Sequence, residues 1–217
     1  FIVYFQSFTN TYAPIATLKA LYEKALSFEN VIGLSIGTRT DCVTDEILDY
    51  LVDLSKDKEI WIEFGIQSFY DETLVHINRG DTADNMRYWI KRSKEKGLNV
   101  CGHLIYGLPK ETQEMMLETF RQTVELKVDS IKFHPLYVVK NTLLTNEFKK
   151  GRFTPISEEL YIDTVVKSIK NLPENISIQR ITAGINDSTL LSPDWCRDKH
   201  TQMKNIRLAL EKEGFNY

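Results

Sequence analysis

The sequence predicts an α/β fold in which parallel strands form a curved sheet around a cavity. Six apolar segments of strand character alternate with amphipathic helical segments along the 217 residues, and such alternation gives parallel strands joined by right-handed crossovers. The strands also carry polar side chains on one parity, whereas strands buried on both faces of an open sheet are apolar throughout. A sheet whose concave face lines a cavity explains both observations.

The strands are recognised by their alternation. In the segment IWIEFGIQS, apolar side chains share one face, and the other face carries Glu63 and Gln67. Because a buried carboxylate or amide is costly without a partner, this strand indicates a site. The six predicted strands are residues 1–6, 31–36, 59–67, 98–106, 130–136 and 176–182.

The helices between them are expected from their capping residues and apolar stripes. They begin near Pro14, Thr44, Thr82, Thr112, Ser157 and Asp198. A short helical stretch should end at INRGD (77–81), and residues 138–155 are expected to form the longest irregular connection. We expect residues 1–184 to form the barrel-like domain and residues 185–217 to form an extension that packs on it.

Composition bounds the function class. The chain has 42% hydrophobic residues and a net charge of -3, so no global basic field favours nucleic acid. No apolar run approaches the ~20 residues of a membrane helix, and three distant cysteines indicate no disulfide framework. A cytoplasmic protein without a membrane partner is expected. Phe1 is not an initiator methionine, so we expect the chain to be a fragment of a protein that begins upstream.

Polar strand ends predict the site, because the carboxyl ends of parallel strands converge on one rim. Arg39 is suited to a carboxylate or phosphate, or pairs with Asp41 or Asp45. Glu63 is suited to a substrate ammonium, or forms a buried ion pair with Lys132. Gln67 is suited to sugar hydroxyls.

Further candidates lie on neighbouring strands and turns. Arg79 is a second candidate for binding a carboxylate, or an exposed arginine at a helix end. Gly107 lets a backbone approach a flat ligand, or is an ordinary turn glycine. His103 and His134, on the cavity parity, are candidate ligands, acid–base groups or hydrogen-bonded core histidines.

The strand-end motifs, in their order along the chain, resemble the radical S-adenosylmethionine (SAM) superfamily. The likeness is to its YhcC-like branch, which is related to the Elongator catalytic subunit and to oxygen-independent coproporphyrinogen oxidase. The motifs are YFQSFTNTYAP (4–14), GLSIGTRTDC (33–42), WIEFGIQS (61–68), INRGD (77–81), HLIYGLPKET (103–112), IKFHPLYVVKNT (131–142) and SPDWCRDKH (192–200).

The resemblance implies a partial (β/α)6 TIM-like barrel whose first strand and cluster loop are absent here. It implies that SAM is bound by its methionyl group at Gln6, Glu63 and Arg79. Arg39 is a further SAM-binding candidate because of its position at a strand end. The ribose would lie at Gln67, and the adenine at Gly107 and the backbone around Leu136. The family's CxxxCxxC motif does not occur in the 217 residues, so a [4Fe-4S] cluster is expected only in the full-length protein.

The function hypothesis is a radical SAM enzyme. It would cleave SAM reductively and abstract hydrogen from an unknown substrate, with His103, Lys132 and His134 on the substrate side. An external electron donor is an implied partner; an RNA substrate is compatible with the relatives but has no support from charge. Two alternatives stay open: a metal-independent Schiff-base lyase or aldolase using Lys132, and a non-catalytic nucleoside-binding module.

Overall fold

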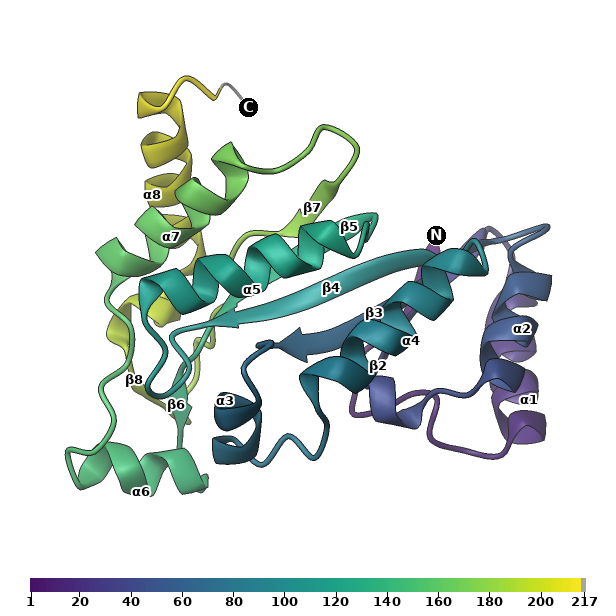
Figure 1. Cartoon of the computed structure of the whole chain (residues 1–217), viewed down its shortest axis with the longest axis horizontal. Coiled ribbons are helices and arrows are strands. Elements are labelled where there is room, and N and C mark those ends of the chain that lie inside the picture. Colours follow the sequence, from purple (N-terminus) through teal and green to yellow (C-terminus); the bar gives the residue numbers. More distant parts are fainter. Residues whose placement is uncertain (216–217) are drawn as a thin grey trace.

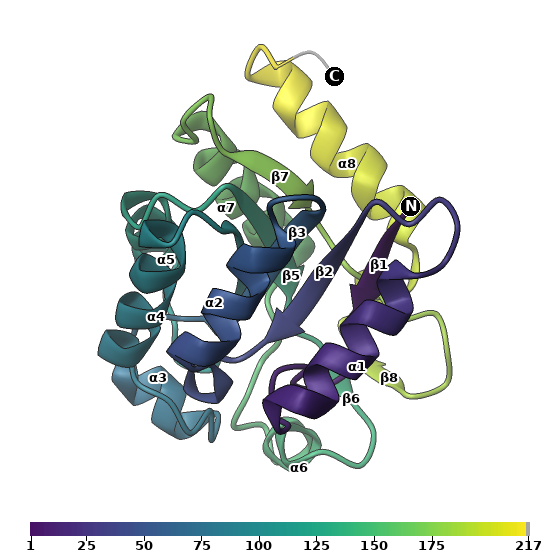
Figure 2. The ribbon, with the colours of Figure 1, turned by 90° about the vertical axis from the view of Figure 1, so that its right-hand side faces the viewer.

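A computed structural model describes residues 1–215 and shows six parallel strands in one curled sheet. The strand order is β1-β2-β3-β4-β5-β7, and the helices α1 to α5 cover one face while the other face is concave (Figures 1 and 2). The strands are β1 (Ile2–Phe5), β2 (Gly33–Thr38), β3 (Glu59–Gln67), β4 (Asn99–Tyr106), β5 (Ser130–Pro135) and β7 (Ser177–Arg180). The predicted partial barrel and its six strands are confirmed.

The helices begin where the capping residues predict. Thr44, Thr82, Thr112 and Ser157 each accept a hydrogen bond from a backbone N–H in the first turn of the following helix. The helices are α1 (Ile15–Leu26), α2 (Asp45–Leu54), α3 (Asp71–His76), α4 (Ala83–Glu95), α5 (Gln113–Glu125), α6 (Leu143–Lys149), α7 (Glu158–Lys170) and α8 (Lys199–Lys212). Among residues 1–215, no helix combines the length and apolar character needed to span a bilayer.

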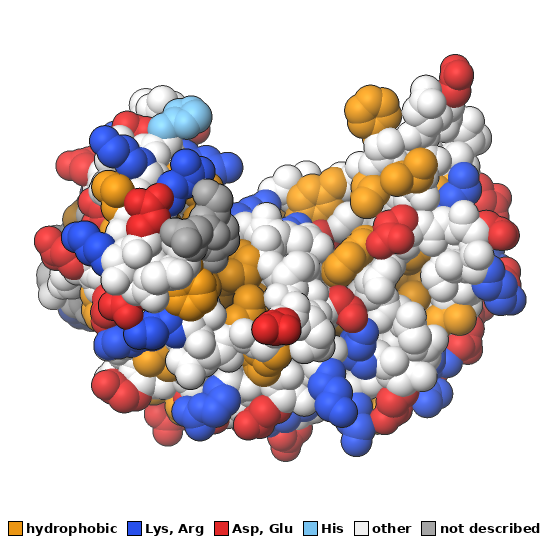
Figure 3. Space-filling model, turned by 90° about the horizontal axis from the view of Figure 1, so that it is seen from above, with side chains coloured by type: hydrophobic (Ala, Val, Ile, Leu, Met, Phe, Trp, Pro, Cys, Tyr) orange, Lys and Arg blue, Asp and Glu red, His pale blue; other side chains and the backbone are white. Residues whose placement is uncertain are grey.

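The main core lies between the convex face of the sheet and the helices. Ile62, Phe64, Leu104 and Phe133 are among its fully buried side chains, and they come from the apolar parity of their strands. The side chains of the other parity face the hollow side of the molecule. Figure 3 shows this hollow between two raised parts of the surface. Alternation in the strands therefore separates a dry core from a polar lumen.

The expectation of an irregular connection over residues 138–155 is wrong. This segment contains β6 (Val138–Val139) and α6, and β6 pairs antiparallel with β8 (Leu190–Ser192). Thr142 caps α6 at the N–H of Thr145. A two-residue strand shows no alternation, and its partner lies about fifty residues away, so only tertiary contacts define it.

Two register shifts shape the concave face. One lies in β3 between Gly65 and Gln67, where it pairs with β4. The second lies where β5 pairs with β7: Ile131 is opposite Ile178, but Lys132 is opposite Arg180. Gln179 is therefore the extra residue of a bulge. The bulge moves Arg180 to the cavity face, although it has the parity of Ile178.

Candidate functional site

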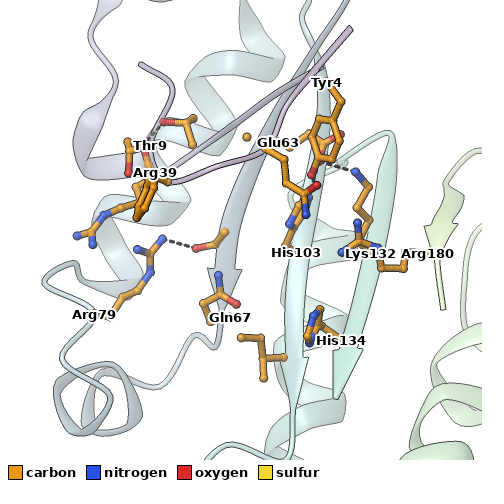
Figure 4. A pocket seen from close by; sticks show the side chains of 16 residues that line it. Tyr4, Thr9, Arg39, Glu63, Gln67, Arg79, His103, Lys132, His134 and Arg180 are labelled. Carbon is orange, nitrogen blue, oxygen red and sulfur yellow. Dashed lines mark hydrogen bonds and ion pairs between the residues drawn. The ribbon is translucent and has the colours of Figure 1, made fainter. Parts of the chain in front are cut away.

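The lumen of the sheet holds a cavity of about 440 Å³ lined by side chains from all six strands (Figure 4). This volume lies within the usual range for small-molecule sites. Eight of the predicted site residues line it together: Gln6, Arg39, Glu63, Gln67, Arg79, His103, Lys132 and His134. Gly107 and Leu136 do not line this cavity; they border two neighbouring ones.

Glu63 lies at the base of the cavity, and its side chain is 1% exposed. One carboxylate oxygen contacts Lys132 Nζ at 2.5 Å and His103 Nε2 at 2.6 Å. The other oxygen accepts a hydrogen bond from the Ser35 hydroxyl. These contacts correspond to the alternative prediction of a buried ion pair with Lys132, and they leave Glu63 little capacity to bind a ligand.

The protonation states of this cluster follow from its contacts. Burial tends to raise the pKa of Glu63, but hydrogen bonds from His103, Lys132 and Ser35 lower it to about 2. Burial lowers the pKa of His103, against the opposing effect of Glu63. At neutral pH Glu63 is therefore a carboxylate, and His103 is a neutral imidazole that donates from Nε2.

Tyr4 completes the base of the cavity, and the sequence prediction did not include it among the site residues. Its ring lies 4.5 Å from Lys132 Nζ in a cation–π contact, and burial followed by the Glu63 charge raises its pKa. Tyr4 and Gln6 lie on the same face of the first predicted strand, and this shared face could have identified Tyr4 as a site residue. Ser35 was missed as a site residue despite the same kind of signal.

Arg39 and Arg79 lie on the opposite side of the cavity (Figure 4). Arg39 makes two hydrogen bonds to Asp41, at 2.8 and 2.6 Å, which agrees with one of the alternative predictions. Burial raises the pKa of Asp41, but the pairing with Arg39 outweighs it and the net shift is downward. Arg39 therefore reaches the cavity with its charge already compensated.

Arg79 is positioned by the end of α3 and retains free donors. Asn78, at φ 54°, ends the helix, and the N–H of Arg79 bonds to Leu74 O. Arg79 Nη2 donates to Gly65 O at 2.5 Å, while its buried Nε has no partner among residues 1–215. A buried donor without a partner is costly, so an acceptor supplied by a ligand would satisfy it.

Gly65 and Gln67 lie beside Arg79. A side chain at Gly65 would come within 2.6 Å of Gln67 Nε2 and 3.4 Å of Arg79 Nη2, so glycine keeps both polar groups close to the backbone. Gln67 has φ 68°, a conformation uncommon for residues other than glycine, and such strain gathers at functional sites. Gly65, Gln67 and Arg79 thus form a compact polar surface that faces the cavity.

His134 lies on the β5 side of the cavity. Its Nδ1 is 2.8 Å from the carbonyl oxygen of Pro135, so Nδ1–H donates there and Nε2 carries the lone pair. Burial lowers its pKa to about 4; the Pro135 carbonyl opposes this shift, and the positive charge of Arg180 adds to it. His134 is a neutral acceptor at physiological pH.

The His134 shift predicts an acid-sensitive fold. The folded pKa of about 4 lies below the ordinary histidine value of 6.5, so the unfolded state binds the proton more tightly and stability falls as pH drops from about 7 to about 4. We expect the loss to be about 2–3 kcal/mol, because each pKa unit corresponds to about 1.4 kcal/mol and the ring stays partly exposed. His103 adds a loss of the same sign.

Urea unfolding at several pH values measures this loss. His134→Gln should make the stability curve shallower between pH 7 and 4, whereas the exposed His200 gives the matched control His200→Gln with the wild-type slope. Equal slopes for all three proteins would contradict the assignment.

Gly107 has a packing role in the structure. Its φ is 90°, and a side chain at this position would come within 2.7 Å of Ile156. The glycine thus permits both a left-handed turn after β4 and close packing against the segment before α7.

Gly107→Ala is expected to destabilise the protein by about 2–4 kcal/mol, through backbone strain and overpacking together. Gly97 has φ 85°, but a methyl group added there would meet no atom of residues 1–215 within 4 Å, so Gly97→Ala should cost only the strain, about 1 kcal/mol. Urea unfolding of both variants checks the difference. A similar loss of stability in the two variants would show that the Ile156 side chain moves aside without a loss of free energy.

The cysteines do not fit an iron–sulfur cluster. Cys101 and Cys196 are buried, and burial raises the pKa of each to about 12. Their thiols are protonated at neutral pH, whereas cluster ligands are thiolates. Cys42, on the rim, also has a raised pKa, again through burial and then the Asp41 charge. These three side chains supply no cluster site.

The chain is similar to known proteins along nearly its whole length. The model of the Radical SAM superfamily matches residues 2–123, and that of the Radical_SAM C-terminal domain matches residues 128–212. Protein YhcC of Escherichia coli K12 is 38% identical over 216 residues, which are 99% of this chain and 70% of YhcC. The uncharacterised protein YtqA of Bacillus subtilis is 33% identical over 99% of this chain and 66% of its own length.

A solved structure shows the same fold. The archaeal Methanocaldococcus infernus Elp3 with an N-terminal deletion superposes with a TM-score of 0.77 at 24% identity. The superposition covers 92% of this chain and 46% of the Elp3 chain. The present chain therefore spans about half of the Elp3 chain and about two thirds of YhcC and YtqA.

Proposed function

Since this chain belongs to the radical SAM superfamily, we propose that its lumen cavity is a SAM-binding site and that the protein is an enzyme. The observation that carries the proposal is the buried Nε of Arg79, which has no hydrogen-bond partner among the described residues and lies beside Gly65 and Gln67. The methionyl carboxylate of SAM supplies the acceptor that this donor lacks. A carboxylate matches the planar donors of a guanidinium, because both can form two parallel hydrogen bonds.

The remaining parts of SAM are assigned by neighbouring polar groups. Gln67 is proposed to bond the ribose hydroxyls, and Gln6, exposed at the end of β1, the methionyl amino group. Ile105 borders both the lumen cavity and the adjacent cavity that contains Leu136, so we assign the adenine to this border. Glu63 is assigned as a positioning residue, because Ser35, His103 and Lys132 already occupy its oxygens.

For the whole protein we propose reductive cleavage of SAM at a [4Fe-4S] cluster and hydrogen abstraction from an unidentified substrate. The cluster thiolates would come from residues outside this sequence, and an external donor would supply the electron. The residues of this chain bind SAM, orient it and shield it from water. His103, Lys132 and His134 are proposed to face the substrate.

The test is formation of 5′-deoxyadenosine by the full-length protein. The protein is reconstituted with iron and sulfide, reduced, and given SAM with and without reductant. Reductant-dependent 5′-deoxyadenosine above the level without enzyme supports the proposal. If full-length protein with an intact cluster releases none, and binds no SAM by equilibrium dialysis, the proposal fails.

The same preparations test the two other functions. Borohydride reduction in the presence of carbonyl compounds would trap a Schiff base at Lys132, but the contact between its Nζ and Glu63 disfavours this route. A nucleoside-binding module would bind SAM equally with and without cluster reconstitution and form no 5′-deoxyadenosine.

A further inference from the structure

The lumen contains more positive charge than SAM requires. Five charged side chains line it: Arg39, Glu63, Arg79, Lys132 and Arg180. Arg39 is paired with Asp41, and Lys132 with Glu63. Two guanidinium groups, those of Arg79 and Arg180, have no ion-pair partner among residues 1–215.

The two unpaired guanidinium groups lie on different sides of the cavity. Arg79 follows α3 and contacts β3, whereas Arg180 lies on β7 beside Lys132 of β5. Figure 4 shows them on opposite sides of the drawn cavity, with Glu63, Gln67 and His103 between them. A small carboxylate bound at Arg79 therefore does not compensate the charge of Arg180.

The surroundings of Arg180 favour an anion from a ligand. His134, its neighbour on the cavity wall, is neutral, and its Nδ1–H is engaged with the Pro135 carbonyl. The carboxylate of Glu63 is occupied by three donors. SAM bound at Arg79 would add its own sulfonium charge to the lumen and so increase the demand for negative charge.

From this charge imbalance we propose that Arg180 and the adjoining β5 wall form an anion subsite that binds a carboxylate or phosphate group of the substrate. The subsite exists only because of the bulge at Gln179, which moves the guanidinium into the lumen beside Lys132. That the anion belongs to a substrate rests on the proposed function; the anion subsite itself does not. The Arg180 guanidinium would hold the substrate on the side of the cavity away from Arg79.

The test uses His134 as a spectroscopic reporter. The chain has four histidines, so their ring signals are readily resolved by nuclear magnetic resonance, and His134→Gln assigns the relevant one. Inorganic phosphate and acetate are titrated separately at constant ionic strength. An anion bound at Arg180 should shift the His134 signals saturably and raise the pKa of this imidazole from about 4, because a nearby negative charge favours the imidazolium.

Variants locate the anion. Arg180→Gln should abolish the saturable shift, and Arg180→Lys should weaken binding about tenfold, because an ammonium lacks the bidentate geometry. Arg79→Gln should leave the shift unchanged. If Arg180→Gln does not fold, as judged by circular dichroism, Arg180→Lys and Arg79→Gln still show whether the anion binds at Arg180 or at Arg79.

The outcomes are distinct. Saturation by phosphate alone identifies a phosphorylated ligand, and saturation by acetate identifies a carboxylate; both support the subsite. No saturation by either anion, or a shift that survives in Arg180→Gln or disappears in Arg79→Gln, overturns it. SAM affinity, measured separately by dialysis, should not be weaker in Arg180→Gln than in the wild type, so failure of the anion subsite and failure of the SAM proposal are told apart.

Discussion

Glu63→Gln is expected to destabilise the protein by about 3–5 kcal/mol, as when one partner of a buried ion pair is removed. Glutamine has the size of glutamate, so packing is kept while the charge is lost. The Lys132 ammonium, whose side chain is 9% exposed, then remains without a counter-charge. Urea unfolding at pH 7 measures the loss of free energy of unfolding.

Two comparisons isolate the charge effect. Glu118 pairs with the well-exposed Arg121, and Glu118→Gln should change stability by less than about 1 kcal/mol. Adding Lys132→Met to Glu63→Gln removes the unpaired ammonium, so the double variant should be more stable than the sum of the single losses predicts. A loss below about 1 kcal/mol in Glu63→Gln would mean that the pair contributes no more than a surface contact.

The same residue sets a pH window. The pKa of Glu63 is about 2 in the folded protein, below the ordinary glutamate value of 4.5. Its contribution to stability is therefore present above about pH 4.5 and is lost as pH falls toward 2. Glu63→Gln should remove the loss of stability between about pH 4.5 and 2. This loss extends to a lower pH than the loss caused by His134.

Arg79→Gln is expected to weaken SAM binding by about 10- to 100-fold. A hydrogen bond to a charged group contributes about 1.5–3 kcal/mol, and the half-buried Arg79 makes it with the methionyl carboxylate in the proposed complex. Equilibrium dialysis of the protein with SAM, without reductant, measures the affinity separately from turnover.

Arg39→Gln is the matched comparison, because Arg39 lines the same cavity but is paired with Asp41. We expect the SAM affinity of Arg39→Gln to change by less than about threefold, because the Arg39 guanidinium already donates two hydrogen bonds to Asp41. Arg79→Lys should retain part of the affinity, because charge is kept and the planar donors are lost. Unchanged affinity in Arg79→Gln would refute the assigned carboxylate position.

Some features depend only on local sequence. The alternation in β3 predicts which side chains face the core and which face the lumen, and Thr44, Thr82, Thr112 and Ser157 mark the helix starts. The polar strand ends also predict a common site. Eight of the ten proposed SAM and substrate residues line one cavity because the carboxyl ends of parallel strands converge.

Other features depend on contacts between distant segments. Whether Glu63 is free or paired was an open alternative, because the sequence contains both Glu63 and Lys132 but does not state their distance. The need for glycine at position 107 depends on its packing against Ile156, about fifty residues later. The strand β6 forms only because it pairs with β8. Local periodicity contains no information about such partners.

The sequence by itself determined the curved α/β sheet, the starts of the capped helices and most of the polar residues that face the lumen, because these follow from backbone periodicity and capping. Only the tertiary structure decided which of these residues are already paired and which remain free. Arg180 shows the reason most directly: a single extra residue, Gln179, shifts the register against β5 and moves the guanidinium to the opposite face. Strand register is a property of two segments together.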